Sequence, residues 1–240
     1  MVRDERGVPL PPSHRRPAPR LDRERAWWAE GAVVAGVDEV GRGAWAGPVT
    51  YAAVVLPTDR RVYKLRDSKT LDPAAREHLA RRLRGVAPGI GIGHASNREI
   101  DRLGMSLAMR LAARRAVEAL PDRPDVLLLD GNWDFLADFP SHNERLIGGD
   151  ARCASIAAAS IVAKAARDSL MRHAEPRFPP YDFASNKGYP TPAHLASLDA
   201  QGPCELHRLS WRPVAAARWN ATAPRLPLDE VTGVGSSAFG

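Results

Sequence analysis

The chain has little cysteine and no long apolar run. Among its 240 residues are only two cysteines, Cys153 and Cys204, which stand far apart in the sequence. This number is too small for a disulfide framework or a zinc cluster, and it fits the reducing environment of the cytoplasm. No stretch approaches the roughly 18 apolar residues of a membrane span, and residues 1–20 lack the apolar core of a signal peptide. We therefore expect a cytoplasmic protein without membrane contact.

Lysine is also scarce, although the chain is basic. It has 4 lysines against 30 arginines, and its net charge is +6. Seven arginines against four acids give residues 1–26 a charge of +3, while residues 27–220 carry +4 and residues 221–240 carry −1. A basic balance indicates an acidic partner such as nucleic acid. Because residues 27–220 are only mildly basic, such a site must come from local arrangement of charges.

Three segments are predicted from composition and length. Residues 1–26 are rich in proline and arginine, which predicts a disordered basic arm. Residues 27–220 are long enough for one sizeable domain, whose C-terminal part is predicted to be helical from about residue 175. Residues 221–240 lack periodicity, which predicts a flexible tail.

The apolar pattern predicts alternating strands and helices. Strands are expected at 32–38, 49–56, 89–96, 125–131 and 144–150, and helices at 72–83, 96–120, 151–174 and 191–202. The first two strands are expected to pair like a hairpin. Asp72 is a predicted helix cap, and Ser96 with Glu99 is a predicted capping box. The order predicts an α/β domain with a mixed sheet and a helical C-terminal part.

Carboxylates follow three of the predicted strands. Asp38 and Glu39 end the first strand, Asp130 ends "DVLLLD", and Asp150 follows "ERLIGG". Functional groups of α/β sheets gather at strand ends, and four carboxylates in one place repel each other unless cations lie between them. Their oxygens suit Mg²⁺ or Mn²⁺. Taken singly, Asp150 could instead cap the next helix, and Asp130 could belong to an ordinary turn.

Other motifs could contact a phosphate or a sugar. The glycines of Gly41–Gly43 either form a simple turn or let the backbone approach a ligand closely. Lys69, Lys164 and Lys187 lie in motif-like surroundings, where each is either a phosphate contact or an ordinary surface lysine. Tyr189 is either a core residue beneath the C-terminal helix or an aromatic platform for a nucleotide.

Seven stretches together resemble the ribonuclease HII family. They follow one another between residues 35 and 214 and read AGVDEVGRGAWAGPVTYAAVVL, LRDSKTL, REIDRLGMSLAMRLAARRAV, LLLDGN, GGDARCASIAAASIVAKAARDSLM, NKGYPTPAHL and GPCELHRLSWRPV. The resemblance implies a ribonuclease H-like mixed sheet flanked by helices and followed by a helical C-terminal segment.

The resemblance also implies an activity. Such an enzyme cleaves the RNA strand of RNA–DNA hybrids and the 5′ side of ribonucleotides embedded in duplex DNA, leaving 3′-hydroxyl and 5′-phosphate ends. Two Mg²⁺ or Mn²⁺ ions are expected in the site when substrate is bound. Its partners are these nucleic acids, and it is expected to be a monomer.

The resemblance assigns roles to individual residues. Asp38, Glu39 and Asp130 match the family's metal-binding acids, and Asp150 matches the fourth. Residues Gly41, Arg42 and Gly43 match the element that senses the ribose 2′-hydroxyl, and Tyr189 matches the tyrosine that stacks at the RNA–DNA junction.

Three other interpretations are weighed against this one. A DNA nuclease or integrase-like transferase of the same fold would keep the acids but lack the pairing of Gly41–Gly43 with Tyr189. A non-enzymatic hybrid-binding module would have lost an acid, yet all four are present. A small-molecule α/β enzyme would be expected to carry a glycine-rich nucleotide loop, which is not found.

Overall fold

The computed structural model describes residues 18–60, 62, 65 and 71–217. The predicted tail at 221–240, most of the predicted arm and Lys69 lie outside the described residues, so their predictions stay predictions. Within the described ranges, no helix is both long and apolar enough to cross a membrane.

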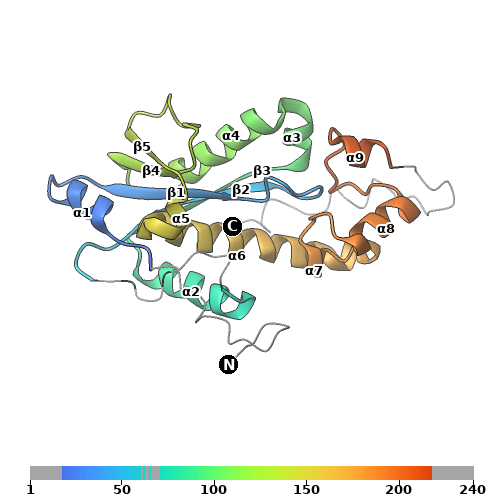
Figure 1. The fold of residues 1–240 in the computed structure, drawn as a ribbon, viewed down its shortest axis with the longest axis horizontal. Helices are drawn as coiled ribbons and strands as arrows, with labels where there is room; N and C mark the ends of the chain where they lie inside the picture. The colour runs from blue at the N-terminus through green and yellow to red at the C-terminus, as the bar shows by residue number, and fades with distance from the viewer. Residues whose placement is uncertain (1–17, 61, 63–64, 66–70, 218–240) are drawn as a thin grey trace, which may run out of the picture.

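A five-stranded mixed sheet forms the centre of the fold (Figure 1). Its strands lie in the order β3 (Gly89–Ala95), β2 (Val49–Val55), β1 (Val34–Val40), β4 (Val126–Asp130) and β5 (His142–Leu146). β1 is antiparallel to β2 and parallel to β4. β2 and β3 are antiparallel, whereas β4 and β5 are parallel. The predicted mixed sheet and the hairpin-like pairing of β1 with β2 are confirmed.

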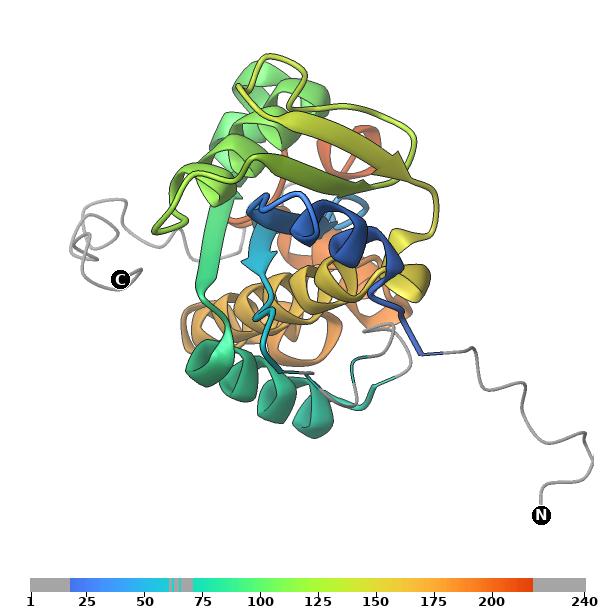
Figure 2. The ribbon, with the colours of Figure 1, turned by 90° about the vertical axis from the view of Figure 1, so that its left-hand side faces the viewer.

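Helices cover both faces of the sheet. One face is covered by α4 (Met105–Glu118) and the other by α6 (Ala154–Ala174), with α2 (Pro73–Val86) packed outside α6 (Figures 1 and 2). Side chains of β2 alternate between the two layers: Tyr51 and Ala53 join the core under α4, and Ala52 and Val54 join the core under α6. Asp72 caps α2 as predicted, since its side chain accepts the N–H of Ala75.

Small residues bring α6 very close to β1. A Cβ atom on Gly36 would lie 2.5 Å from the carbonyl oxygen of Ser155. The alanines at 157–159 of α6 are also fully buried. Helix α6 is thereby fixed against the strand that carries Asp38 and Glu39.

Two helices predicted as continuous are interrupted. The helix expected at 96–120 consists of α3 (Asn97–Leu103) and α4, because the chain turns at Gly104, where φ is 77°. Its capping box between Ser96 and Glu99 is confirmed. The helix expected at 151–174 consists of α5 (Gly149–Arg152) and α6, separated by an extended Cys153. Cys153 is extended because it pairs with Arg20, which the local sequence does not reveal.

The ordered domain begins earlier than the predicted boundary at residue 27. Helix α1 (Asp22–Trp28) precedes β1. The side chain of Glu24 is fully buried, and its Oε1 accepts the N–H of Ser155 at 2.7 Å, in the first turn of α6. A carboxylate at a helix N-terminus is stabilised by the unpaired N–H groups there. The prediction that residues 1–26 are all disordered is therefore wrong for this helix.

The C-terminal part is helical, as predicted. After α6 come two short 3₁₀ turns and then α7 (Phe183–Asn186), α8 (Pro192–Gln201) and α9 (Arg212–Ala215). These elements gather around the buried rings of Phe178, Tyr181 and Phe183. They lie beyond the end of the sheet where β1 finishes (Figure 1).

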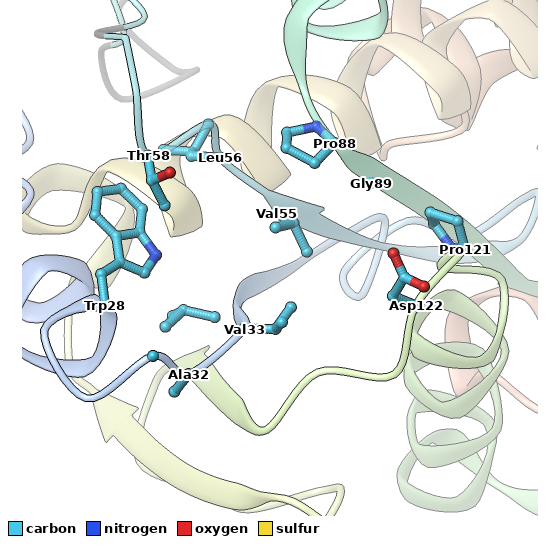
Figure 3. Close-up of a pocket in the computed structure, with 12 residues that line it drawn as sticks. Trp28, Ala32, Val33, Val55, Leu56, Thr58, Pro88, Gly89, Pro121 and Asp122 are labelled. Atoms are coloured by element: carbon cyan, nitrogen blue, oxygen red, sulfur yellow. The ribbon is translucent and has the colours of Figure 1, made fainter.

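A mostly apolar pocket of about 340 Å³ lies at the opposite end of β1. Its lining includes Trp28, Val33, Val55, Pro88 and Pro121 (Figure 3). The carboxylates that follow the strands are not among its lining residues.

Candidate active site

Asp38 and Asp130 lie side by side because of the register between β1 and β4. The two strands run parallel, and Val37 is level with Leu129. The next residues along the strands, Asp38 and Asp130, are therefore level too. The prediction that acids of separate strands meet at one end of the sheet is confirmed for this pair.

Asp38 is buried and held in place. Its Oδ1 accepts the backbone N–H of Glu39 at 2.7 Å, and its carboxylate is hydrogen-bonded to the side chain of Ser160 in α6. Burial, followed by the negative charges of Glu39 and Asp130, raises the pKa of Asp38 well above its ordinary value. A cation between the acids would offset the repulsion among these charges.

Asp150 reaches the same region through α5. The N–H of Gly149 donates to Oδ1 of Asp130 at 2.7 Å, so the start of α5 is tied to the end of β4. Asp150 is buried in the first turn of α5. It does not cap the following helix, because the N-cap position of α5 is Gly148 and that of α6 is Cys153.

Tyr51 of β2 was not predicted as part of this region. It is level with Glu39 in the register of β1 and β2. Its hydroxyl is buried without a hydrogen-bond partner among the described residues. Burial and the charges of Glu39, Asp38 and Asp130, partly offset by Arg42, raise the pKa of Tyr51. Only its place in an apolar strand is visible in the sequence, which predicts an ordinary core residue.

The donor set of this acid cluster (Asp38, Glu39, Asp130 and Asp150) fits a hard divalent cation. All the donors are carboxylate oxygens, which suit Mg²⁺ or Mn²⁺. Burial, followed by the charges of Glu39 and Asp130, raises the pKa of Asp38. In the described part of the chain, however, no group of three or more His, Cys, Asp or Glu side chains stands close enough to hold an ion. Asp38, Glu39 and Asp130 are thus close enough to influence one another's charge without forming a finished coordination cage.

The Gly41–Gly43 turn directly follows β1. Gly41 is buried with φ at 87°, and a Cβ atom there would lie 2.8 Å from the carbonyl oxygen of Pro48. Glycine is favoured by this conformation and by the lack of space. Arg42 and Gly43 are exposed. The turn therefore presents its middle to solvent next to the acid cluster.

Tyr189 lies beside this turn and is half-buried. The carbonyl oxygen of Gly188 accepts the N–H groups of Trp45 at 2.8 Å and Ala46 at 3.2 Å, which joins the Tyr189 loop to the chain just after the turn. Two cations approach the Tyr189 ring: Lys164 Nζ lies 5.7 Å and Arg167 Cζ 5.4 Å from its centroid. The interpretation of Tyr189 as a core residue does not match this partial exposure.

The predicted lysines differ in their surroundings. Lys164 lies beside the Tyr189 ring and forms an ion pair with Asp168 at 2.7 Å. The ammonium of Lys187 donates to the backbone carbonyls of Ala184 and Ser185. Burial lowers the pKa of Lys187.

The comparison with protein families shows which family the chain belongs to. The family model described as Ribonuclease HII matches residues 35–214. The chain belongs to the ribonuclease HII family. Curated relatives agree: the Ribonuclease HII of Streptomyces avermitilis is 50% identical over 179 residues, which cover 75% of this chain and 76% of that protein.

Further relatives support the same family and fold. The Ribonuclease HII of Streptomyces griseus is 48% identical, covering 78% of this chain and 80% of that protein. The crystal structure of the ribonuclease H2 from Pyrococcus horikoshii superimposes with a TM-score of 0.66 at 25% identity, covering 76% of this chain and 95% of that one. The ribonuclease H-like fold is thereby confirmed.

Membership of the ribonuclease HII family gives the protein its class of activity. It is a metal-dependent hydrolytic endoribonuclease that acts on RNA–DNA hybrids. This decides against a DNA nuclease or transferase, a non-enzymatic binding module and a small-molecule enzyme.

Two buried histidines near Tyr189 are not among the site residues predicted from the sequence. The N–H of Cys204 donates to Nδ1 of His207 at 3.0 Å, so Nε2 of His207 carries the proton and faces Nε2 of His194 at 3.0 Å. Nδ1 of His194 then donates to the carbonyl oxygen of Tyr189 at 2.9 Å. This histidine relay (His194 and His207) holds the backbone of Tyr189. Histidines 13 residues apart carry no local signal that predicts such a pair.

Proposed function

We propose that this ribonuclease HII cleaves on the 5′ side of a ribonucleotide, both in RNA–DNA hybrids and in duplex DNA with embedded ribonucleotides. The products are a 3′-hydroxyl and a 5′-phosphate. One observation carries the proposal: the acid cluster adjoins the Gly41–Gly43 turn, and hydrogen bonds to Gly188 join the chain after that turn to the loop of Tyr189. The acids proposed to cut, the turn proposed to recognise ribose and the ring of Tyr189 are thus neighbours.

The acids are proposed to hold the metal. Asp38, Glu39, Asp130 and Asp150 would bind two Mg²⁺ or Mn²⁺ ions, which, when bound, activate the attacking water and stabilise the leaving 3′ oxygen. Asp38 is oriented by the N–H of Glu39, and Asp130 by the N–H of Gly149. Carboxylates fixed in this way need little rearrangement before the reaction.

The Gly41–Gly43 turn is proposed to recognise the ribose 2′-hydroxyl, the group that distinguishes RNA from DNA. The turn directly follows the strand that carries Asp38 and Glu39. Gly43 is exposed and has no side chain, so a sugar can approach its backbone. Recognition therefore takes place next to the acids that cut.

Tyr189 is proposed to check the next sugar along the strand. A deoxyribose has no 2′-hydroxyl, so an aromatic ring can approach it closely, whereas a ribose would crowd the ring. Tyr189 is partly exposed and is oriented through its carbonyl by His194. Lys164, beside the ring, and Lys187, in the preceding residues, are proposed phosphate contacts, as is Lys69 outside the described residues.

Substitution of Tyr189 tests this function. Tyr189→Ala should lower kcat/KM on a duplex with one ribonucleotide by about 5- to 150-fold, because stacking of this kind contributes roughly 1–3 kcal/mol. Tyr189→Phe keeps the ring and should lose less. The measurement is kcat/KM for each variant beside a thermal melt, with the cut position mapped on a sequencing gel. A Tyr189→Ala variant that melts lower but cuts normally per folded molecule would show that the tyrosine serves the fold alone.

A further inference from the structure

Two arginines lie buried beneath the Gly41–Gly43 turn. Arg167 belongs to α6 and Arg208 to the segment between α8 and α9, and both side chains are 0% exposed. In the described ranges of the chain, neither guanidinium lies within ion-pair distance of a carboxylate. A buried charge is costly unless hydrogen bonds compensate it. Their burial also prevents both residues from touching a substrate.

Arg208 holds the first two residues of the turn and the chain that follows it. Its Nη2 donates to the carbonyl oxygen of Gly41 at 2.6 Å, its Nη1 to that of Arg42 at 2.9 Å, and its Nε to that of Gly47 at 3.1 Å. Burial, followed by the positive charge of Arg167, lowers the pKa of Arg208 to about 9, so the side chain still carries its charge at neutral pH.

Arg167 connects the same segment to the Tyr189 loop. Its Nε donates to Pro48 at 2.8 Å and its Nη2 to Ala46 at 2.9 Å, both through backbone carbonyls. Its Nη1 donates to the carbonyl oxygen of Lys187 at 2.9 Å, two residues before Tyr189. Its Cζ also lies 5.4 Å from the centroid of the Tyr189 ring. One rigid guanidinium thus spans the two loops.

We propose that Arg208 and Arg167 are positioning residues: Arg208 fixes the Gly41–Gly43 turn, and Arg167 fixes the spacing between that segment and Tyr189 and so sets the preference for an RNA–DNA junction. The proposal rests on the roles proposed above for the turn and for Tyr189. A planar guanidinium donates in several fixed directions, whereas a lysine ammonium is a compact charge on a flexible chain. Lysine at either position keeps the charge and loses the spacing.

The experiment compares Arg167→Lys and Arg208→Lys with wild type on two substrates. One is duplex DNA with a single ribonucleotide, which contains the junction, and the other is a hybrid with a continuous RNA strand. Arg172→Lys is the matched control, because Arg172 is a partly exposed arginine of the same helix that pairs with Glu77. Thermal melts give the folded fraction of each variant.

Arg167→Lys should lower kcat/KM on the single-ribonucleotide duplex by about tenfold or more, since a displacement of about 1 Å can cost that much. On the continuous hybrid, which does not require Tyr189 to find a junction, the loss should stay below about threefold. Arg208→Lys should lower both activities, because both substrates need the turn. Arg172→Lys should change neither.

A double-mutant cycle separates positioning from general stability. If Arg167 acts through Tyr189, Arg167→Lys should have little further effect on the junction substrate in a Tyr189→Ala background. Independent, multiplying losses in the double variant would overturn the proposal, as would equal losses of Arg167→Lys on the two substrates. If Tyr189→Ala alone has no effect on the junction substrate, the proposed role of Tyr189 fails, whatever the arginines do.

If Arg167→Lys does not fold, Arg208→Lys alone tests the proposal. The proposal then requires kcat/KM to fall further than the folded fraction does. Normal turnover per folded molecule of Arg208→Lys would overturn it.

Discussion

His207 is a titratable residue that the fold keeps neutral. Burial, followed by the charge of His194, lowers the pKa of His207 to about 3, and burial also lowers the pKa of His194. An unfolded histidine has a pKa of about 6.5. Between these values the unfolded chain binds a proton that the folded chain does not bind. The contribution of this histidine to the free energy of unfolding is therefore fully present above about pH 6.5 and is lost as the pH drops toward 3.

His207→Asn should make this loss of stability shallower. One differential proton changes the free energy of unfolding by at most about 1.4 kcal/mol per pH unit, so the wild type should lose about 1–2 kcal/mol more than the variant between pH 7 and pH 5. Urea unfolding at both pH values measures this difference. His173→Asn, which removes an exposed histidine of α6, is the control. An unchanged pH slope in His207→Asn would mean that the relay is protonated in the folded protein.

Residues of the site differ in how far the sequence predicts them. Asp38 and Asp130 end apolar strands, and a strand end is a local signal. Arg167 and Arg208 are different, because their acceptors lie 20 to 167 residues away in the chain. Backbone carbonyls are also present at every residue, so no sequence pattern marks those that accept. Tyr51 was missed for the opposite reason, since its apolar neighbours predict a plain core residue.

At the scale of elements, the contact between α6 and β1 fixes the site. Gly36 lets the strand lie against the helix, and Asp38 two residues later accepts a hydrogen bond from Ser160 of that helix. The helix itself is held at its N-terminus by Glu24. Strand, helix and acid are therefore positioned together.

Gly36→Ala should be strongly destabilising. Its Cβ atom would overlap backbone atoms of Ser155, which cannot move without shifting α6, and overpacking of this kind costs about 1–3 kcal/mol or more. Gly85→Ala is the matched control, because nothing lies within 4 Å of a Cβ atom there. Since Gly85 lies within α2, alanine should stabilise by up to about 1 kcal/mol. Chemical unfolding of both variants measures these changes, and similar stabilities would contradict the close approach.

Most elements could be predicted from local pattern, but their ends could not. The cap at Asp72 and the capping box at Ser96 depend on neighbours three residues away, and both are confirmed. The break at Cys153 depends on Arg20, and helix α1 is anchored by a contact between Glu24 and Ser155. Such contacts between distant segments appear only after the chain has folded.

At the scale of the whole molecule, the ribonuclease HII fold gathers negative charge at one end of a sheet in a basic chain. The net charge of +6 favours approach of a nucleic acid. The acid cluster alone would repel a phosphate backbone, which makes a bound cation essential to the proposed reaction. The central claim is therefore that the acids act together through a divalent metal.

The most direct measurement is cleavage of duplex DNA carrying one ribonucleotide by wild type, Asp38→Asn and Asp130→Asn, each with Mg²⁺, with Mn²⁺ and with a chelator. Asp199→Asn, at an exposed position of α8, is the control. Wild type and control should cut only with metal, leaving 3′-hydroxyl and 5′-phosphate ends, and both active-site variants should lose at least about 100-fold in kcat without melting at a lower temperature. Cleavage in the chelator, or near-normal metal-dependent cleavage by either variant, would contradict the account.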